Sequence, residues 1–75
     1  MNPAIKVNYH VYEIRIRNGI SLRELSRLSG VSKSQINNIE NGLKHPTVYT
    51  LCLLSRALGI PPEDLYTWTV EDCPP

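Results

Sequence analysis

The stretch of sequence that decides the fold is SLRELSRLSGVSKSQINNIENG, residues 21–42. It opens with Ser21-Leu22-Arg23-Glu24, a capping box in which the serine side chain accepts from a backbone N–H and the glutamate reaches back to the cap. The helix that begins there is expected to run to about Leu28 or Ser29, because Gly30 can adopt the left-handed conformation that ends a helix. Its apolar stripe is formed by Leu22, Leu25 and Leu28.

A second capping box, Ser32-Lys33-Ser34-Gln35, follows at once. Val31 stands just before the cap, where an apolar residue often packs on the following helix, and the partner position is Ile36. This helix is expected over about residues 32–41 and ends at Asn41-Gly42. Two capped helices separated by a tight, glycine-containing turn meet at a large angle. The sequence therefore predicts a helix-turn-helix motif over about residues 21–41.

Another helix is expected before this motif. Asn8 can cap it, and it covers about Tyr9 to Arg17. Within it, Val11 and Ile14 lie three positions apart and share one face. Asn18-Gly19 is expected to end it.

Two more helices are expected after the motif. Thr47 can cap a fourth helix that continues to about Leu58, where Gly59 ends it. Ile60-Pro61-Pro62 begins a short fifth helix, since proline is tolerated in a first turn. The apolar side of the fourth helix comprises Val48, Leu51, Leu54, Ala57 and Leu58. The prediction is a single all-α domain of five helices over residues 1–75, with a tail over residues 67–75.

Composition argues against several function classes. His10 and His45 lie on different predicted elements, and the sequence shows neither a nucleophile–base pair nor a metal-ligand spacing. Cys52 and Cys73 lack the spacing of a zinc site, and Cys52, within an apolar run, is expected to be a small core residue. Unpaired thiols fit a reducing, cytoplasmic compartment. We therefore expect no enzymatic activity, metal, cofactor, small-molecule ligand or membrane association.

The net charge of +1, from 8 basic and 7 acidic residues, is only a weak indication of nucleic-acid binding. The charges are unevenly distributed, however. The basic residues of the first 45 positions are Lys6, Arg15, Arg17, Arg23, Arg27, Lys33 and Lys44, against the acids Glu13, Glu24 and Glu40. If the protein meets DNA, it does so with this part of the chain.

The predicted helix over residues 32–41 carries two contrasting faces. Ile36 and Ile39 fall on one side. The other side presents only hydrogen-bonding side chains, namely Lys33, Ser34, Asn37, Asn38 and Asn41. Asparagine matches the donor and acceptor pattern of adenine, lysine donates to guanine, and serine can face either. Asparagine is also a poor helix former, so its repeated use indicates readout of base edges in a major groove rather than helix stability.

These motifs together resemble the Cro/repressor-type (Xre-family) helix-turn-helix domain. The resemblance rests on residues 19–26, 29–36 and 39–42, supported by residues 46–51 and 57–60, and covers about Val7 to Tyr66. It implies a five-helix, lambda-repressor-like fold and sequence-specific binding to double-stranded DNA. It also implies transcriptional regulation, here expected to be repression, by a homodimer on a two-fold operator.

The resemblance also implies roles for individual residues. Base contacts would come from Lys33, Ser34, Asn37 and Asn38, and phosphate contacts from Ser21, Arg23, Asn41 and Lys44. Glu40 lies at the edge of this face, where its negative charge would be repelled by phosphates unless a cation pairs with it. The family pattern implies that this cation is Arg15, near the end of the first helix. The sequence departs from phage repressors at Leu22, where glutamine often helps to hold a phosphate, so that contact is left to Ser21, Arg23 or the backbone.

Two alternative functions stay open. One is an antitoxin-like or adaptor helix-turn-helix module whose main partner is another protein. The polar helix face over residues 32–41 argues against that as the sole role, because it lacks an apolar anchor. The other is RNA binding. The sequence does not indicate the exposed aromatic platform that is expected for binding single strands.

The chain ends carry a different pattern. Ile5 and Val7 alternate with a polar residue, as do Trp68 and Val70, and this period of two suits short strands. The two segments could pair within one chain, which closes the domain. They could also pair across two chains and form a continuous sheet; in either case we expect a homodimer joined through the chain ends.

Overall fold

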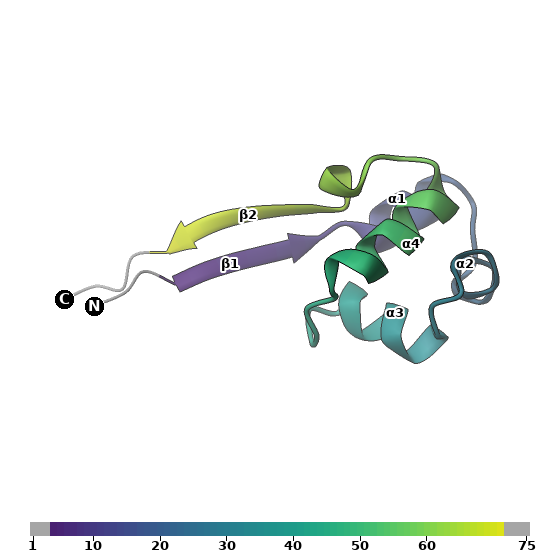
Figure 1. The fold of residues 1–75 in the computed structure, drawn as a ribbon, viewed down its shortest axis with the longest axis horizontal. Coiled ribbons are helices and arrows are strands. Elements are labelled where there is room, and N and C mark those ends of the chain that lie inside the picture. The colour runs from purple at the N-terminus through teal and green to yellow at the C-terminus, as the bar shows by residue number, and fades with distance from the viewer. Residues whose placement is uncertain (1–3, 72–75) are drawn as a thin grey trace.

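Four α-helices form the body of the molecule, and two strands extend from it as a narrow ribbon (Figure 1). The computed structural model describes residues 4–71. The elements are β1 (Ala4–Tyr9), α1 (Val11–Arg17), α2 (Leu22–Ser29), α3 (Lys33–Glu40), α4 (Val48–Leu58), the 3₁₀ helix η1 (Pro62–Leu65) and β2 (Tyr66–Glu71). No helix in residues 4–71 is both long enough and apolar enough to cross a bilayer.

The helix-turn-helix motif has the predicted caps. The Ser21 hydroxyl accepts from the Glu24 backbone N–H at 3.0 Å, and the Ser32 hydroxyl accepts from the Gln35 N–H at 3.2 Å. Gly30 has a φ of 79°, the left-handed conformation expected at the end of α2. The side chain of Glu24 does not return to its cap, because its carboxylate binds Arg27 instead.

The core lies where all four helices and η1 meet. It consists of Val11, Leu25, Val31, Ile36, Ile39, Leu51, Leu54, Leu58 and Leu65. Val31 and Ile36, the predicted pair at the start of α3, are both buried. Of the residues of α3, only Ile36 and Ile39 belong to this core, so the helix has one buried face and one free face.

The expectation of five α-helices is wrong. The fifth is only the four-residue 3₁₀ helix η1, after which the chain turns at once into β2. The Leu65 carbonyl accepts from the His10 N–H at 2.8 Å, and Tyr66 pairs with Tyr9. Pairing with β1 thus takes the backbone groups that a longer helix would need.

The first helix also begins later than expected. Asn8 belongs to β1, opposite Thr67, so it cannot cap a helix, and α1 begins at Val11. Val11 is buried and Ile14 half-buried, as their shared face predicts.

Three residues expected in the core are exposed. Cys52 follows Leu51 by one position and is turned about 100° away from the core face of α4. Val48 and Leu28 stand at the ends of their apolar stripes, where no element covers them, with exposed fractions of 75% and 46%. Cys73, the other cysteine, lies outside the described residues.

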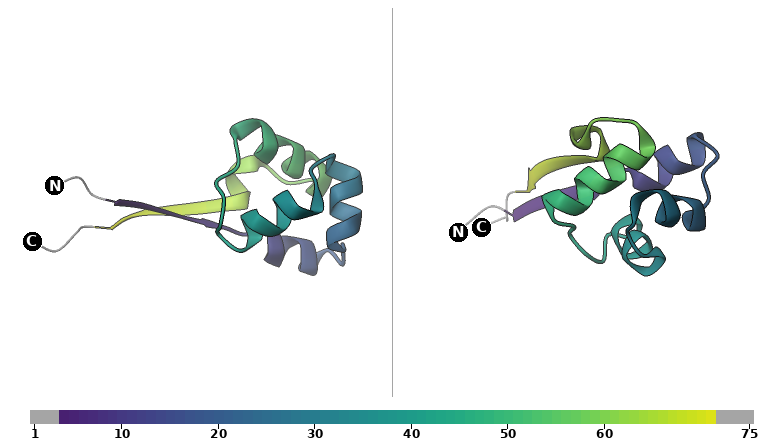
Figure 2. Two further views of the ribbon diagram at one scale, coloured as in Figure 1. Left: turned by 90° about the horizontal axis from the view of Figure 1, so that it is seen from below. Right: turned by 45° about the vertical axis from the view of Figure 1, so that its right-hand side comes forward.

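The strands at the two ends of the chain pair with each other, in antiparallel register from Ala4 opposite Glu71 to Tyr9 opposite Tyr66. Most of the expected tail is therefore strand β2, and residues 72–75 lie outside the described part. The ribbon projects from the helices in every view (Figure 2) and gives the molecule extents of 46 × 21 × 21 Å.

Candidate nucleic-acid interface

Helix α3 presents a polar face to solvent. Ile36 and Ile39 are fully buried beneath it. On its outer side Lys33, Ser34 and Asn37 are exposed, and Asn38 is half-buried. The helix lies along the lower side of the body (Figure 1), and its polar face points away from the other helices because its apolar face packs on them. The four residues expected to contact bases thus lie together on a convex surface of a size that enters a major groove.

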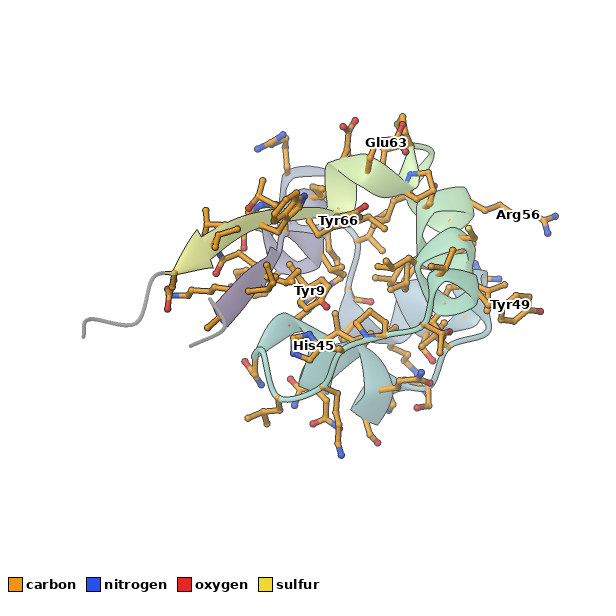
Figure 3. The ribbon with its side chains drawn as sticks, turned by 60° about the vertical axis from the view of Figure 1, so that its left-hand side comes forward. Tyr9, His45, Tyr49, Arg56, Glu63 and Tyr66 are labelled. Atoms are coloured by element: carbon orange, nitrogen blue, oxygen red, sulfur yellow. The ribbon has the colours of Figure 1, made fainter. Side chains whose placement is uncertain are left out.

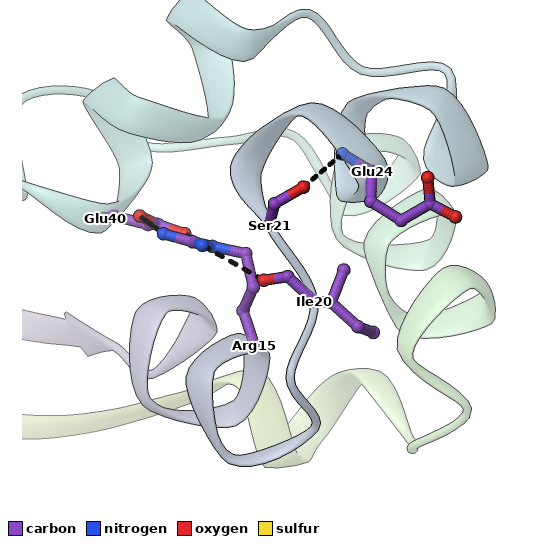
Figure 4. A network of polar contacts seen from close by, with 5 residues as sticks. All are labelled: Arg15, Ile20, Ser21, Glu24 and Glu40. Carbon is purple, nitrogen blue, oxygen red and sulfur yellow. Dashed lines mark hydrogen bonds and ion pairs between the residues drawn. The ribbon is translucent and has the colours of Figure 1, made fainter.

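A buried ion pair fixes this helix. Arg15 Nε donates to Glu40 Oε2 at 2.9 Å, and Arg15 Nη2 donates to Glu40 Oε1 at 3.0 Å (Figure 4). Only 9% of the arginine side chain and 6% of the glutamate side chain remain exposed. This bidentate geometry is the strong form of the interaction. The hydrogen bond to Glu40 raises the pKa of Arg15 above its ordinary value.

The same guanidinium makes two further contacts. Its Nη1 donates to the Ile20 carbonyl at 3.1 Å, and Ile20 immediately precedes the Ser21 cap of α2 (Figure 4). Its carbon lies 5.3 Å from the centre of the Tyr12 ring, within cation–π range. Arg15 therefore connects α1, the entry to α2 and the end of α3, and it sets the position of both helices of the motif.

The residues expected to contact phosphates flank α3. Ser21 and Arg23 stand at the start of α2, and Asn41 and Lys44 follow the end of α3; all four are exposed. The turn after α3 is closed by the Leu43 N–H, which donates to the Asn38 carbonyl at 2.8 Å.

Within residues 4–71, the cations expected at this surface have no carboxylate partner. In residues 4–71, Lys6, Arg15 and Arg27 form ion pairs with carboxylates, whereas Arg23, Lys33 and Lys44 form none. Arg17 and Arg56 also form none in these residues, so the free cations are not confined to the interface, but the three expected there are all among them. Because phosphate binding needs positive charge without an internal partner, this distribution favours contact with a nucleic-acid backbone.

Two features of the surface escaped the sequence interpretation. The sequence pattern gives Gln35 a role only in a capping box, but its side chain is exposed beside Ser34 at the start of α3. Gln35 directly precedes the buried Ile36 and follows Ser34 on the polar side, and this position could have indicated that its side chain is exposed.

The other is a hydrogen bond at 2.7 Å between the Tyr9 hydroxyl and His45 Nδ1, which joins β1 to the loop that carries Lys44 (Figure 3). Burial raises the pKa of Tyr9. No local signal joins residues 36 positions apart, so the sequence could not predict this bond.

Comparison with known proteins agrees with this geometry. The model of the helix-turn-helix family HTH_3 matches residues 11–65. The chain is 36% identical over 58 residues to an uncharacterized HTH-type transcriptional regulator of Sinorhizobium fredii, covering 77% of this chain and 75% of that protein. It is also 36% identical over 47 residues to an uncharacterized HTH-type transcriptional regulator of Mycobacterium tuberculosis, covering 63% of this chain but only 34% of that longer protein.

Solved structures show the same similarity. The restriction-modification controller protein C.AhdI from Aeromonas hydrophila superposes with a TM-score of 0.71 at 29% identity, over 73% of this chain and 83% of that one. An HTH_3 family transcriptional regulator from Vibrio cholerae gives a TM-score of 0.68 at 32% identity, over 71% of this chain and 30% of the other.

Proposed function

The chain belongs to the helix-turn-helix family HTH_3, whose members are DNA-binding transcriptional regulators, and from this we propose that it recognises one duplex sequence by inserting α3 into the major groove. The observation that carries the proposal is the outer face of α3. It is polar along its length, and its fixed position relative to α1 depends on the buried pair of Arg15 and Glu40.

The proposal assigns two kinds of contact. Side chains on α3 would read base edges, with Asn37 and Asn38 suited to adenine and Lys33 to guanine, while Ser34 can face either. Ser21, Arg23, Asn41 and Lys44 flank α3 and would hold the two phosphate backbones, which fixes the register without reading sequence.

We further propose that the working species is a homodimer that represses transcription in the cytoplasm. One eight-residue recognition helix contacts few base pairs, and two copies on half-sites about one helical turn apart multiply that readout. Repression is the simplest outcome, because a bound dimer blocks access to the DNA it covers. The proposal includes no catalytic step.

Selection of bound duplexes from a random pool tests base readout. We expect a two-fold consensus for the wild type and none for a variant carrying Asn37→Ala and Asn38→Ala. Asn8→Ala, an exposed asparagine on β1, is the matched control and should retain the consensus.

Salt dependence separates DNA binding from the adaptor alternative. Affinity for random duplex DNA should fall linearly with the logarithm of salt concentration, because phosphate contacts release counterions. A protein that enriches no sequence and shows no salt-dependent affinity for duplex DNA would contradict the proposal and favour a protein partner.

A further inference from the structure

The two faces of the ribbon, β1 with β2, differ completely in chemistry. Residues opposite one another in an antiparallel pair point to the same side, so the register assigns every residue to a face. The apolar face consists of the pairs Ile5 with Val70, Val7 with Trp68 and Tyr9 with Tyr66. The polar face consists of the pairs Ala4 with Glu71, Lys6 with Thr69 and Asn8 with Thr67. Such strict alternation is the pattern of a sheet that has one buried side.

Among residues 4–71, the apolar face has a cover only at its base. Tyr9 and Tyr66 pack against the core, whereas Ile5, Trp68 and Val70 have exposed fractions of 58%, 59% and 50%. The face continues into a shallow apolar groove of about 250 Å³ that reaches Val48 at the start of α4. A two-stranded ribbon is marginally stable in water unless its apolar face packs on something. The exposed part of this face therefore favours contact with a partner surface.

We propose that a second copy of this chain covers the apolar face, so that the two ribbons stack face to face around a two-fold axis. This inference rests on the proposed function, since it specifies how the regulator dimerises. The face carries no charged side chain, and two identical neutral surfaces can meet without like-charge repulsion. The ion pair between Lys6 and Glu71, at 4.0 Å, lies on the polar face and stays in solvent.

The placement of α3 is compatible with this arrangement. In Figure 1 the strands lie one above the other, so the faces of the ribbon look toward and away from the viewer, while α3 lies on the lower side of the body. A two-fold axis running from top to bottom of that view joins two apolar faces and reverses the second ribbon. Both α3 helices then lie on the same side of the dimer, as binding to one side of a duplex requires.

The length of the ribbon also fits this arrangement. Strands of six residues span about 20 Å. Two overlapping ribbons hold the helical bodies apart at opposite ends, at a separation on the order of the 34–36 Å between half-sites one turn apart. The face is narrow, so we expect a contact smaller than the roughly 1,200–2,000 Å² of standard interfaces and an affinity in the micromolar range.

Neighbouring residues of β2 supply the matched variants for a test. Trp68→Glu places a charge on the apolar face, and Thr69→Glu places the same charge on the polar face one residue away. In sedimentation equilibrium over micromolar to hundreds of micromolar concentrations, the wild type and Thr69→Glu should dimerise, whereas Trp68→Glu should remain monomeric. A monomeric wild type would overturn the proposal, as would Trp68→Glu that dimerises like the wild type; the latter would indicate pairing through strand edges.

Two measurements guard against misfolding. Val70→Glu, at the far end of the same face, should also be monomeric, and circular dichroism should show native helix content for all three variants.

The wild type needs no substitution for a second readout, because Trp68 is the only tryptophan. Quenching of its fluorescence by acrylamide should decrease as protein concentration rises, and quenching independent of concentration would exclude this face as the contact.

DNA binding separates this inference from the proposed function. Trp68→Glu should bind a single half-site with wild-type affinity but lose on the order of 100-fold or more on the two-fold site, because the linkage of two readers is gone. An equal affinity of both proteins for the two-fold site would overturn the dimer surface and leave base readout intact. A wild type that dimerises but enriches no DNA sequence would refute the proposed function alone.

Discussion

Two arginine–glutamate pairs in this molecule have nearly the same geometry but very different surroundings. Arg15 and Glu40 connect α1 to α3 and are almost fully buried. Arg27 and Glu24 lie one turn apart on α2, with two hydrogen bonds of 3.1 and 2.5 Å, and their side chains are 68% and 43% exposed.

The difference teaches that burial, not geometry, decides what such a pair does. Water and ions screen the exposed pair, and its two partners are already held together by the helix. The buried pair joins residues 25 positions apart and leaves a desolvated charge if either partner is removed. Only the buried pair can therefore determine where α3 lies.

The largest effect is expected from Arg15→Ala. Removing one partner of a buried pair costs about 3–5 kcal/mol, because the other charge is left uncompensated. In a domain of this size that is much of the total stability, and about 4–8 °C of melting temperature is lost per kcal/mol. Thermal unfolding followed by circular dichroism should show a large decrease.

Arg17→Ala is the control for that measurement. Arg17 is exposed at the end of the same helix and forms no ion pair within residues 4–71. Equal decreases in melting temperature for Arg15→Ala and Arg17→Ala would show that burial does not determine how much these arginines contribute to stability.

Replacing both partners sharpens the comparison. A variant with Arg15→Met and Glu40→Leu removes both charges and keeps similar volume, so it should recover most of the stability lost by Arg15→Ala. The hydrogen bond to Ile20 is lost, however, and so is the connection to the entry of α2. We therefore expect weaker binding to the selected DNA site than in the wild type despite recovered stability. Full recovery of both stability and DNA affinity would mean that the ion pair contributes only packing volume and does not position the helices.

The sequence could predict what local chemistry determines. The caps at Ser21, Ser32 and Thr47 and the stop at Gly30 are encoded within a few residues, and each is where the pattern placed it. The polar side of α3 follows in the same way from the burial of Ile36 and Ile39. The need of Glu40 for a cation was visible in the sequence, but the identity of Arg15 as its partner came only through resemblance to a family.

The sequence could not determine what long-range pairing decides. Antiparallel pairing of the two chain ends converted an expected helix start at Asn8 into strand and limited the fifth helix to one turn. Leu28 and Cys52 fit an apolar pattern but have no neighbour to bury them, because periodicity says which residues share a face and not how far that face is covered.

A change on α3 that leaves both ion pairs intact should separate binding from stability. Asn38→Ala should cost about 1–3 kcal/mol on the preferred site and relax discrimination at one base pair. Lys44→Ala should weaken binding to all sequences and reduce the salt slope by about 1. Fluorescence anisotropy with specific and random duplexes, at several salt concentrations, measures both effects. The same loss on both duplexes for both variants would contradict base readout by α3.

The smallest effect is expected from Glu24→Gln, which removes the exposed pair. The hydrogen bond from Arg27 lowers the pKa of Glu24, so any stabilisation by the pair is present above the unfolded-state pKa of about 4.3 and is lost as the pH falls through the lower folded-state value. The melting temperature of Glu24→Gln should therefore lie slightly below that of the wild type at pH 7, and the difference should shrink as the pH falls below the unfolded-state pKa. Glu63→Gln, an exposed glutamate outside any ion pair of the described residues, controls for the loss of one negative charge. The control matters because Glu24 also lies in the first turn of α2, where a negative charge is favourable without any arginine. High salt should shrink the Glu24→Gln difference at pH 7 but leave the Arg15→Ala decrease largely unchanged, since screening reaches only the exposed pair. A Glu24→Gln decrease as large as that of Arg15→Ala, or one that does not shrink as the pH falls, would show that exposure does not distinguish the two pairs.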